Sequence, residues 1–507
     1  MSSRIKVVRI YSCFADGLAR VPTELEISLS PGLPTFDVIG LIDSTIRESR
    51  GRIRSALISS GFNMPKGHIT VSISPSYLHK GGSAFDLPAA LGILLVSGQL
   101  PVHEGIRIYA EGELTLTGEL RGTPGASLRL KDTRDYDMAF APSEETTAAS
   151  CAMFKGMLAG SLREVADTIR CGNYLSAEYK DFSETSSDEA EPWQDISCLK
   201  GQNKALKAVL IAAAGWHNIL LLGSPGCGKT MIGKMIRGLM PPLGVKEAAD
   251  LYTVYEAMGA SDDLPSGIRP YRYIHPGISR TELIGSVGSL RPGEISLADH
   301  GILFADEICE FKSEIIDSLR IPMEEKKIAF TKDGRRYVFP SSFLFVGAGN
   351  PCRCGMFYEG SGRCRCTPAV RERYMNKLSG PFKDRIDLFT EMRCISAEEL
   401  RNISTDKTRH LSEDYKEKIN SAWQMQAERF NGSGIDFNGN CNNADAELFR
   451  ADKGVIEFAA EVADSLTSSP RGYCKLLRVG RTIADLDGRA DMRKSDISEA
   501  SVYRRRI

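Results

Sequence analysis

The stretch that decides the fold is Asn218-Ile-Leu-Leu-Leu-Gly-Ser-Pro-Gly-Cys-Gly-Lys-Thr230. Its apolar residues 219–222 suit a short buried strand, and the residues that follow match the pattern G-x-x-x-x-G-K-[ST] of a phosphate-binding loop. Residues 231–240 are predicted to form a helix, which Pro241 and Pro242 end. A chance glycine turn would rarely fall between a strand and a helix in this order. The sequence therefore predicts a nucleotide-binding α/β domain.

The residue types in this loop suit the binding of a nucleotide phosphate. Its glycines let the backbone curl so that several N–H groups point at one anion. Lys229 supplies positive charge to the β- and γ-phosphates, and the hydroxyl of Thr230 is a ligand for Mg²⁺. The predicted cofactors are therefore ATP and Mg²⁺. The predicted cofactor-binding residues are Gly223, Ser224, Pro225, Gly226, Cys227, Gly228, Lys229, Thr230 and, from the motif described next, Asp306.

A pair of acidic residues supplies the second part of the predicted site. The apolar run 301–305 leads directly into Asp306 and Glu307. Asp306 suits a Mg²⁺ ligand, and Glu307 suits the general base that polarises the attacking water. Taken alone, a strand followed by two acids is equally a helix cap. Downstream of a complete phosphate loop, the pair indicates an ATP hydrolase.

Length, charge and cysteine usage narrow the class of protein. A chain of 507 residues suits about three domains. Its 64 Lys and Arg against 65 Asp and Glu exclude a global basic field, so any nucleic-acid site must be local. Thirteen cysteines, one of them in the phosphate loop, fit a reducing compartment. With no signal peptide and no apolar run long enough for a bilayer, we expect a cytoplasmic protein without a membrane partner.

The first 172 residues have the pattern of an α+β domain. Its segments Phe36–Leu41, Glu48–Arg54 and Lys80–Pro88 resemble the amino-terminal domain of the magnesium-chelatase-like AAA+ proteins of the YifB/ComM family. This resemblance implies a Lon-protease-like, ribosomal S5-like fold. Ser83 stands where a Lon-like enzyme carries its nucleophile, but residues 123–129 offer no lysine to act as its base. We therefore expect a structural role for Ser83 at the start of a helix.

The resemblance extends over nearly the whole chain and implies its domain organisation. Between 176 and 195 the composition shifts to Ser, Glu and Asp, which predicts a solvated acidic linker. The expected fold class is α/β, an AAA+ P-loop core with a helical lid behind an α+β domain. The predicted domains are 1–175 (Lon-like amino-terminal domain), 176–195 (acidic linker), 196–393 (AAA+ core with a hairpin and a cysteine-rich insert) and 394–507 (helical lid).

A helix over residues 313–323 and a basic hairpin after it are predicted within the core. Two alternating runs, 327–332 and 335–339, are joined by Asp333 and Gly334, a pair typical of a type I′ turn. The tip carries Lys332, Arg335 and Arg336. In ring-forming relatives the corresponding hairpin projects into the central pore, so the resemblance favours contact of these cations with a DNA backbone. The alternative is a solvated hairpin tip, where basic residues are ordinary.

A further strand, 342–348, leads to a polar residue and then to two pairs of cysteines. Asn350 resembles the sensor-one asparagine of AAA+ proteins, which orients the attacking water. Four thiols in two close pairs can supply a tetrahedral Zn²⁺ site, although C-x-C is tighter than the usual C-x-x-C knuckle. Zinc is favoured here over reduced cysteines in a surface loop. The predicted ligands are Cys352, Cys354, Cys364 and Cys366.

Two arginines are assigned by the resemblance alone. The segment 378–388 is similar to the one that carries an arginine finger, which implies that Arg385 stabilises the phosphoryl group on a neighbouring subunit. The alternative for Arg385 is an ion pair with one of the acids beside it, Asp384 or Asp387. The segment 468–486 resembles the second sensor, for which Arg471 fits best and Arg478 is the runner-up.

Taken together, the resemblance implies an ATPase that works as a homo-oligomeric ring, a hexamer. The implied catalytic residues are Lys229, Glu307, Asn350, Arg385 and Arg471. It also implies helicase-like remodelling of DNA, the branch migration of natural transformation. One alternative is an ATPase that remodels a protein or chelatase complex, like the motor subunit of magnesium chelatase. Another is a non-enzymatic scaffold gated by nucleotide, against which the intact Lys229, Asp306 and Glu307 argue.

Overall fold

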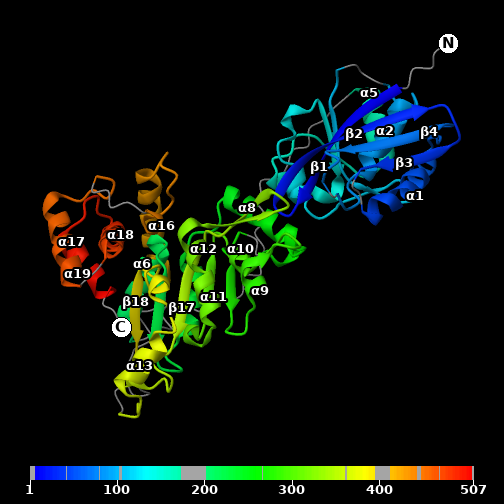
Figure 1. Cartoon of the computed structure of the whole chain (residues 1–507). Coiled ribbons are helices and arrows are strands. Elements are labelled where there is room, and N and C mark those ends of the chain that lie inside the picture. Colours follow the sequence, from blue (N-terminus) through cyan, green and yellow to red (C-terminus); the bar gives the residue numbers. More distant parts are fainter. Residues whose placement is uncertain are drawn as a thin grey trace. The chain divides into compact units, whose positions relative to one another are not determined.

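The computed structural model describes ten stretches of the chain (Figure 1). They are residues 6–40, 43–78, 80–101, 105–172, 201–264, 267–359, 362–393, 411–441, 447–466 and 469–504. The chain divides into two compact units. The first unit takes in residues 1–186, 244–264 and 288–291, and the second takes in the rest. The predicted acidic linker lies outside the described residues. The predicted core and lid fall together in the second unit except for residues 244–264 and 288–291, which belong to the first.

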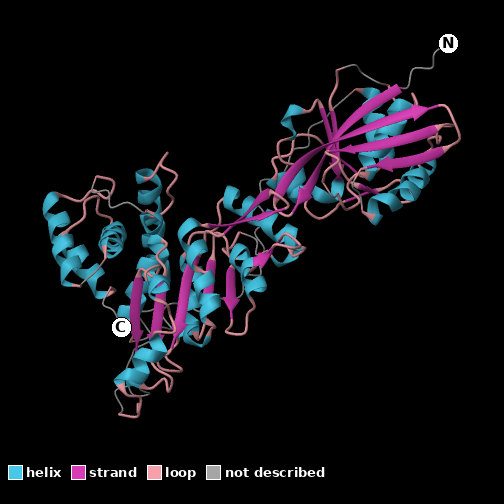
Figure 2. Ribbon diagram, viewed as in Figure 1, coloured by secondary structure: helices cyan, strands magenta, loops and turns pink. Residues whose placement is uncertain are grey.

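The first unit is built on a seven-stranded mixed sheet of order β3-β4-β2-β1-β5-β8-β9 (Figure 2). The pairs β1–β2 and β2–β4 are antiparallel, and the remaining pairs of neighbours are parallel. The strands are β1 (Lys6–Asp16), β2 (Ala19–Ser30), β3 (Thr35–Ile39), β4 (His68–Ser74), β5 (Ile108–Ala110), β8 (Met138–Pro142) and β9 (Met157–Ala159), with a separate pair formed by β6 (Glu113–Leu114) and β7 (Leu120–Arg121).

A buried helix fills the core of this unit. Every residue of α2 (Asp86–Val96) is buried, which explains why its sequence is apolar on all sides. The helix begins at Asp86 rather than at Ser83, and Ser83 donates a hydrogen bond to Glu113. The carboxylate of Asp86 accepts a hydrogen bond of 2.8 Å from Arg52. The other helices are α1 (Ser44–Ser59), α3 (Ala126–Arg129), α4 (Thr146–Cys151), α5 (Leu162–Cys171) and α8 (Val245–Met258).

The helix α8 belongs to this unit although it follows the phosphate loop in the sequence. Its Glu256 accepts hydrogen bonds from the backbone N–H groups of Ala126 and Ser127, at 2.9 and 3.0 Å. Burial raises the pKa of Glu256, and these donors act against that rise. The segment therefore has its partners in the first unit, which a division of the sequence at single boundaries does not anticipate.

The second unit contains a fully parallel sheet of order β11-β14-β17-β10-β18. Every residue of β10, β14 and β17 is buried, as the apolar runs in the sequence require. The predicted α/β fold class is confirmed. In a parallel sheet all carboxyl ends meet at one edge, where ligands bind. The strands are β10 (Ile219–Gly223), β11 (Tyr271–Ile274), β14 (Ile302–Ala305), β17 (Leu344–Gly349) and β18 (Leu388–Met392).

One helix predicted over 313–323 is in fact two, α11 and α12, separated at Leu319. Pro322, in the first turn of α12, has no N–H to donate to the carbonyl of Ser318, so the backbone hydrogen bond that would join the two helices there is missing. None of the described helices is long and apolar enough to cross a membrane. Helices of the second unit are α6 (Asn203–Gly215), α7 (Lys229–Leu239), α9 (Arg280–Ile284), α10 (Glu294–Leu297), α11 (Ser313–Ser318), α12 (Arg320–Glu325), α13 (Pro368–Met375), α14 (Gly380–Lys383), α16 (Leu411–Arg429), α17 (Lys453–Ser465), α18 (Pro470–Leu486) and α19 (Lys494–Val502).

The predicted hairpin is confirmed as β15 (Lys327–Lys332) paired with β16 (Arg335–Pro340). The turn residues Asp333 and Gly334 have φ values of 50° and 75°. A type I′ turn needs positive φ at both central positions, so the turn chemistry predicted from the sequence is the one observed. The pairing sets Lys332 opposite Arg335 at the tip, and Arg336 is exposed.

Candidate nucleotide site

The phosphate loop joins the end of β10 to the start of α7, which begins at Lys229. Gly226 and Gly228 have φ values of 78° and 92°, a backbone conformation that residues with a Cβ rarely adopt. The loop can therefore turn its N–H groups inward ahead of the helix. This is the arrangement that binds a phosphate anion at a helix N-terminus.

The side chain of Lys229 lies across this loop. Its Nζ donates hydrogen bonds to the carbonyls of Gly223 and Ser224, at 2.8 and 3.0 Å, and to Oδ1 of Asn350 at 3.2 Å. Asn350 follows β17, the strand beside β10, so both residues stand at the carboxyl edge of the sheet. The structure thus brings together the predicted phosphate-binding lysine and the predicted sensor asparagine.

The acid pair stands at the same edge, after β14. The hydroxyl of Thr230 donates a hydrogen bond of 2.8 Å to Oδ2 of Asp306, and the backbone N–H of Glu307 donates to Oδ1 at 2.9 Å. A hydroxyl beside a carboxylate is the oxygen set that Mg²⁺ prefers, so these two residues fit the ion that the sequence predicts. Glu307 is exposed and has a φ of 50°, an uncommon backbone conformation for a residue with a side chain.

The two predicted arginines lie at the opposite, amino edge of the sheet. Arg385 precedes β18 and donates to the carbonyl of Pro381 at 2.8 Å and to the carboxylate of Glu324. Arg471, at the start of α18, contacts the other oxygen of Glu324 at 3.4 Å. The structure brings these arginines to one another, and the acid that pairs with Arg385 is Glu324 rather than an adjacent aspartate. Both arginines line a cavity of about 400 Å³ together with Asn218, which precedes β10.

The same cavity is lined by members of a buried ionic cluster centred on Asp387. Lys475 and Arg478 approach the carboxylate at 3.3 and 3.4 Å, and His217 approaches it at 3.4 Å. Burial alone would raise the pKa of Asp387. The positive charges of Lys475 and Arg478 outweigh this effect and hold the pKa of Asp387 well below its usual range. Burial lowers the pKa of Lys475 to about 7.

The runner-up for the second sensor, Arg478, is part of this buried cluster. Its Nη1 also donates to the carbonyls of Gly439 and Cys441, at 2.7 and 3.1 Å. A guanidinium held in this way serves the packing of the unit, whereas Arg471 is exposed over 61% of its side chain. Of the two arginines, Arg471 is therefore the more accessible to solvent.

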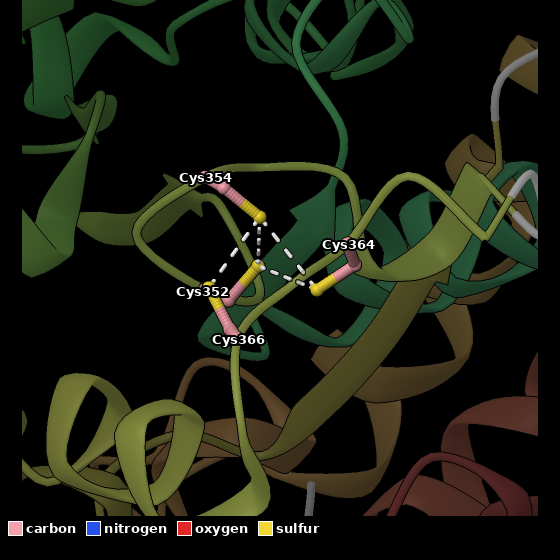
Figure 3. Close-up of side chains that lie close together, drawn as sticks. All are labelled: Cys352, Cys354, Cys364 and Cys366. Carbon is pink, nitrogen blue, oxygen red and sulfur yellow. Dashed lines mark hydrogen bonds between the residues drawn. The ribbon is translucent and has the colours of Figure 1, made fainter.

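Four cysteine side chains gather beyond Asn350 (Figure 3). Their sulfur atoms all lie within 4.8 Å of one another. A hydrogen bond with the backbone of Met356 lowers the pKa of Cys354 to about 7, whereas burial raises the pKa of Cys352 to about 12. The predicted grouping of the four thiols is confirmed. They are Cys352, Cys354, Cys364 and Cys366.

Two features of the site are not apparent in the sequence. Glu324 joins Arg385 and Arg471 although it is 61 residues from one and 147 from the other, and an exposed glutamate near a helix end carries no local signal. Gly355 lies against the ring of Pro225, so close that an added Cβ would meet the proline Cδ at 2.7 Å. In the sequence, the contact between Gly355 and Pro225 is indicated only by the presence of a glycine in a cysteine-rich loop.

The comparisons with known proteins cover both units. Residues 195–400 match the family described as magnesium chelatase, subunit ChlI. Residues 25–142 match the family described as subunit ChlI of Mg-chelatase, and residues 409–504 match the family of the ChlI C-terminal region.

Two of the relatives that match at nearly full length come from Haemophilus influenzae and Escherichia coli. The competence protein ComM of Haemophilus influenzae is 33% identical over 499 residues, which cover 98% of this chain and 97% of that protein. The protein YifB of Escherichia coli is 33% identical over 505 residues, which cover 98% of this chain and 96% of that protein. A magnesium-chelatase 38 kDa subunit from Rhodobacter capsulatus is 26% identical over 186 residues, or 33% of this chain.

The parallel sheet order, with three strand ends gathered around the phosphate loop, is that of an AAA+ type P-loop protein. The chain belongs to the magnesium chelatase ChlI-like family, in its YifB/ComM group. Membership implies an AAA+ ATPase that uses ATP and Mg²⁺, and AAA+ proteins of the ChlI family form rings.

Proposed function

We propose that this protein is a Mg²⁺-dependent ATP hydrolase that works as a hexameric ring and remodels DNA by branch migration. The proposal that the protein forms a ring rests on the separation of the two halves of the site. Lys229, Thr230 and Asp306 stand at the carboxyl edge of the sheet, and Arg385 and Arg471 stand at the amino edge. The five residues of β10 span about 16 Å. An arginine of one chain therefore serves the phosphate loop of the next.

Within each composite site the residues have separate tasks. Lys229 and the loop N–H groups hold the phosphates, and Thr230 with Asp306 holds Mg²⁺, which supplies charge neutralisation when bound. Glu307 takes the proton of the attacking water, and Asn350 orients that water. Arg385 from the neighbouring subunit stabilises the negative charge that develops on the transferred phosphoryl group, with Arg471 beside it.

The choice of DNA as substrate is supported by two observations. The relative from Haemophilus influenzae is named a competence protein, and the family resemblance implies branch migration in natural transformation. The tip of the β15–β16 hairpin carries Lys332, Arg335 and Arg336, a local concentration of positive charge in a chain whose net charge is −1. We assign to this tip the contact with the DNA backbone.

The test is the ATPase rate of the full chain with and without single-stranded, duplex and forked DNA at fixed salt. We expect stimulation by DNA, lost when Lys332, Arg335 and Arg336 are all replaced by Ala. The slope of log affinity against log salt should also fall by about 1 for each phosphate contact removed. A matched control removes the same charge from exposed helix positions, Lys416, Lys418 and Lys453, and should leave the slope unchanged.

The partial match to magnesium-chelatase subunits supports a second candidate function. A motor that remodels a protein or chelatase complex would hydrolyse ATP at the same rate with every DNA and would copurify with a partner subunit. An ATPase rate indifferent to all three DNA forms, with an unchanged salt slope in the hairpin variant, would favour this function over the first.

A further inference from the structure

The four sulfur atoms beyond Asn350 already have the spacing of a metal site (Figure 3). The separations are 3.3 Å for Cys352–Cys354, 3.8 Å for Cys352–Cys364, 3.6 Å for Cys354–Cys364 and 3.5 Å for Cys354–Cys366. Four sulfurs at 2.3 Å from one Zn²⁺ would lie about 3.8 Å apart at the corners of a tetrahedron. A disulfide would need about 2.05 Å. The two remaining sulfur pairs also lie within 4.8 Å, so the observed spacing suits four thiolates around one ion.

The four sulfur donors narrow the choice of metal. Sulfur is a soft ligand, and an all-sulfur tetrahedron suits zinc or iron rather than Mg²⁺ or Ca²⁺. Four thiolates around Zn²⁺ leave a net negative charge on the site. Exposed arginines interleave with the cysteines and can offset that charge. They are Arg353, Arg363 and Arg365.

Both cysteine pairs are attached to the frame of the second unit. The first pair lies in a turn that is closed by a hydrogen bond of 2.9 Å from the N–H of Gly355 to the carbonyl of Cys352. The second pair precedes α13, where Arg371 donates to the carbonyl of Cys366 at 2.8 Å and covers the ring of Phe357 at 4.1 Å. A metal ion between the pairs would therefore join two anchored segments.

The first turn also lies against the phosphate loop. An added Cβ on Gly355 would meet the Cδ of Pro225 at 2.7 Å, so the turn packs directly on that proline. Asn350, which contacts Lys229 at 3.2 Å, lies two positions before Cys352. Movement of the cysteine turn would therefore move the sensor asparagine and one wall of the phosphate loop together.

We propose that Cys352, Cys354, Cys364 and Cys366 bind one Zn²⁺ ion, which holds the turn of Gly355 against the phosphate loop. The metal is structural, because all four positions are filled by protein ligands and none is left for water or substrate. Binding releases the thiol protons to solvent. The binding of zinc stands on the cysteine geometry alone, whereas its effect on ATP hydrolysis rests on the proposed function.

The first experiment measures the metal content of the full chain, purified without chelator, by elemental mass spectrometry. We expect about one zinc per chain, lost when Cys354 and Cys366 are both replaced by Ser. The matched control, Cys171→Ser, changes an exposed cysteine at the end of α5 and should keep its zinc. Wild-type protein that holds iron instead of zinc, or no metal, would overturn the proposal, as would a double variant with full zinc content.

A second measurement does not depend on the folding of any variant. Wild-type protein produced with Co²⁺ in place of Zn²⁺ should show thiolate-to-metal charge-transfer absorption and the intense visible bands of a tetrahedral ion. Titration with Zn²⁺ should remove both signals. Weak visible bands without charge transfer would mean oxygen ligands and would contradict a four-cysteine site.

The last measurement tests the link to the phosphate loop. We expect the serine double variant to lose up to about 100-fold in kcat, because a displacement of about 1 Å at a catalytic group has that effect. Cys171→Ser should keep the wild-type rate. Loss of zinc with unchanged kcat would refute the link. Wild-type protein that holds one zinc but does not hydrolyse ATP would refute the proposed function and leave the metal site standing.

Discussion

At the carboxyl edge of the parallel sheet, the predicted phosphate and Mg²⁺ residues contact one another. Lys229 reaches Asn350 at 3.2 Å, and Thr230 reaches Asp306 at 2.8 Å. At the amino edge, Arg385 and Arg471 meet at Glu324 and face a cavity of about 400 Å³. The predicted site residues of the carboxyl edge therefore contact one another within the chain. Both arginines of the amino edge contact the exposed carboxylate of Glu324, and Arg385 also donates to the carbonyl of Pro381.

This difference shows how one chain can carry two incomplete sites. We propose that the carboxyl edge binds the nucleotide, and neither Arg385 nor Arg471 lies at that edge to stabilise the transferred phosphoryl group. The amino edge has these two cations and no phosphate loop. A ring in which each amino edge meets the next carboxyl edge would complete every site, and this expectation can be tested one residue at a time.

The largest effect is expected from Arg385→Ala. An arginine finger contributes about 10³–10⁵-fold to kcat, so hydrolysis should fall by that factor while ATP binding is retained. Lys229→Ala should instead abolish tight ATP binding. A mixture of the two inactive variants should recover hydrolysis, because some interfaces then pair an intact loop with an intact arginine. Arg373→Ala, an exposed arginine on α13, is the control. A mixture that stays inactive would place both halves of the site in one chain.

A somewhat smaller effect is expected from Glu307→Gln. Loss of a general base lowers kcat by about 10²–10⁴-fold, and ATP binding should remain because the phosphate contacts are untouched. Rates and the affinity for a fluorescent ATP analogue can be measured on the same preparation. Glu310→Gln alters an acid that pairs with Lys377 at 3.4 Å and should keep its rate. Normal turnover in the Glu307 variant would remove this residue from the mechanism.

Asp387→Asn tests the part of the amino edge that we regard as structural. Lys475 and Arg478 would lose their buried counter-charge, and the free energy of unfolding should fall by about 3–5 kcal/mol in a urea titration. Because folding lowers the pKa of Asp387, its contribution is complete above the usual carboxyl range and is lost as the pH falls below it. Asp384→Asn should lose less than about 1 kcal/mol. Equal losses would argue against a buried ionic cluster.

The smallest effect is expected from Glu324→Gln. Its ion pairs with Arg385 and Arg471 are partly exposed, and such pairs contribute about 0–1 kcal/mol. Stability should therefore hardly change, and ATP hydrolysis should be retained because the arginines are freed rather than removed. A loss of hydrolysis as large as that of Arg385→Ala would mean that Glu324 positions the finger.

The sequence predicts best those features whose residues are adjacent in the chain. The phosphate loop, the Asp306–Glu307 pair and the turn at Asp333 follow from local patterns, and the structure has them where they were expected. The contact of Lys229 with Asn350 crosses 121 residues, so it could be reached only through the family resemblance. Glu324 could not be predicted, because an exposed glutamate has no signature apart from its partners.

The break at Leu319 is a different kind of error. The apolar spacing of 313–323 is helical throughout, and this spacing does not reveal that Pro322 removes one backbone hydrogen bond beside Leu319. For the cysteines, spacing predicted the grouping of the four thiols, but a pattern of residues cannot tell how close the turn lies to Pro225. Packing against a distant loop is a property of the folded chain.

The chain enters the first unit three times, because residues 244–264 and 288–291 return to it after the long amino-terminal segment. The carboxylate of Glu256 is satisfied there by backbone N–H groups of residues 126 and 127. A gene fragment that starts after residue 186 would keep α8 and remove its partners, leaving a buried acid and an apolar helix face without cover. The two units are thus not joined at a single point in the sequence, and a cut at any one residue would divide at least one of them.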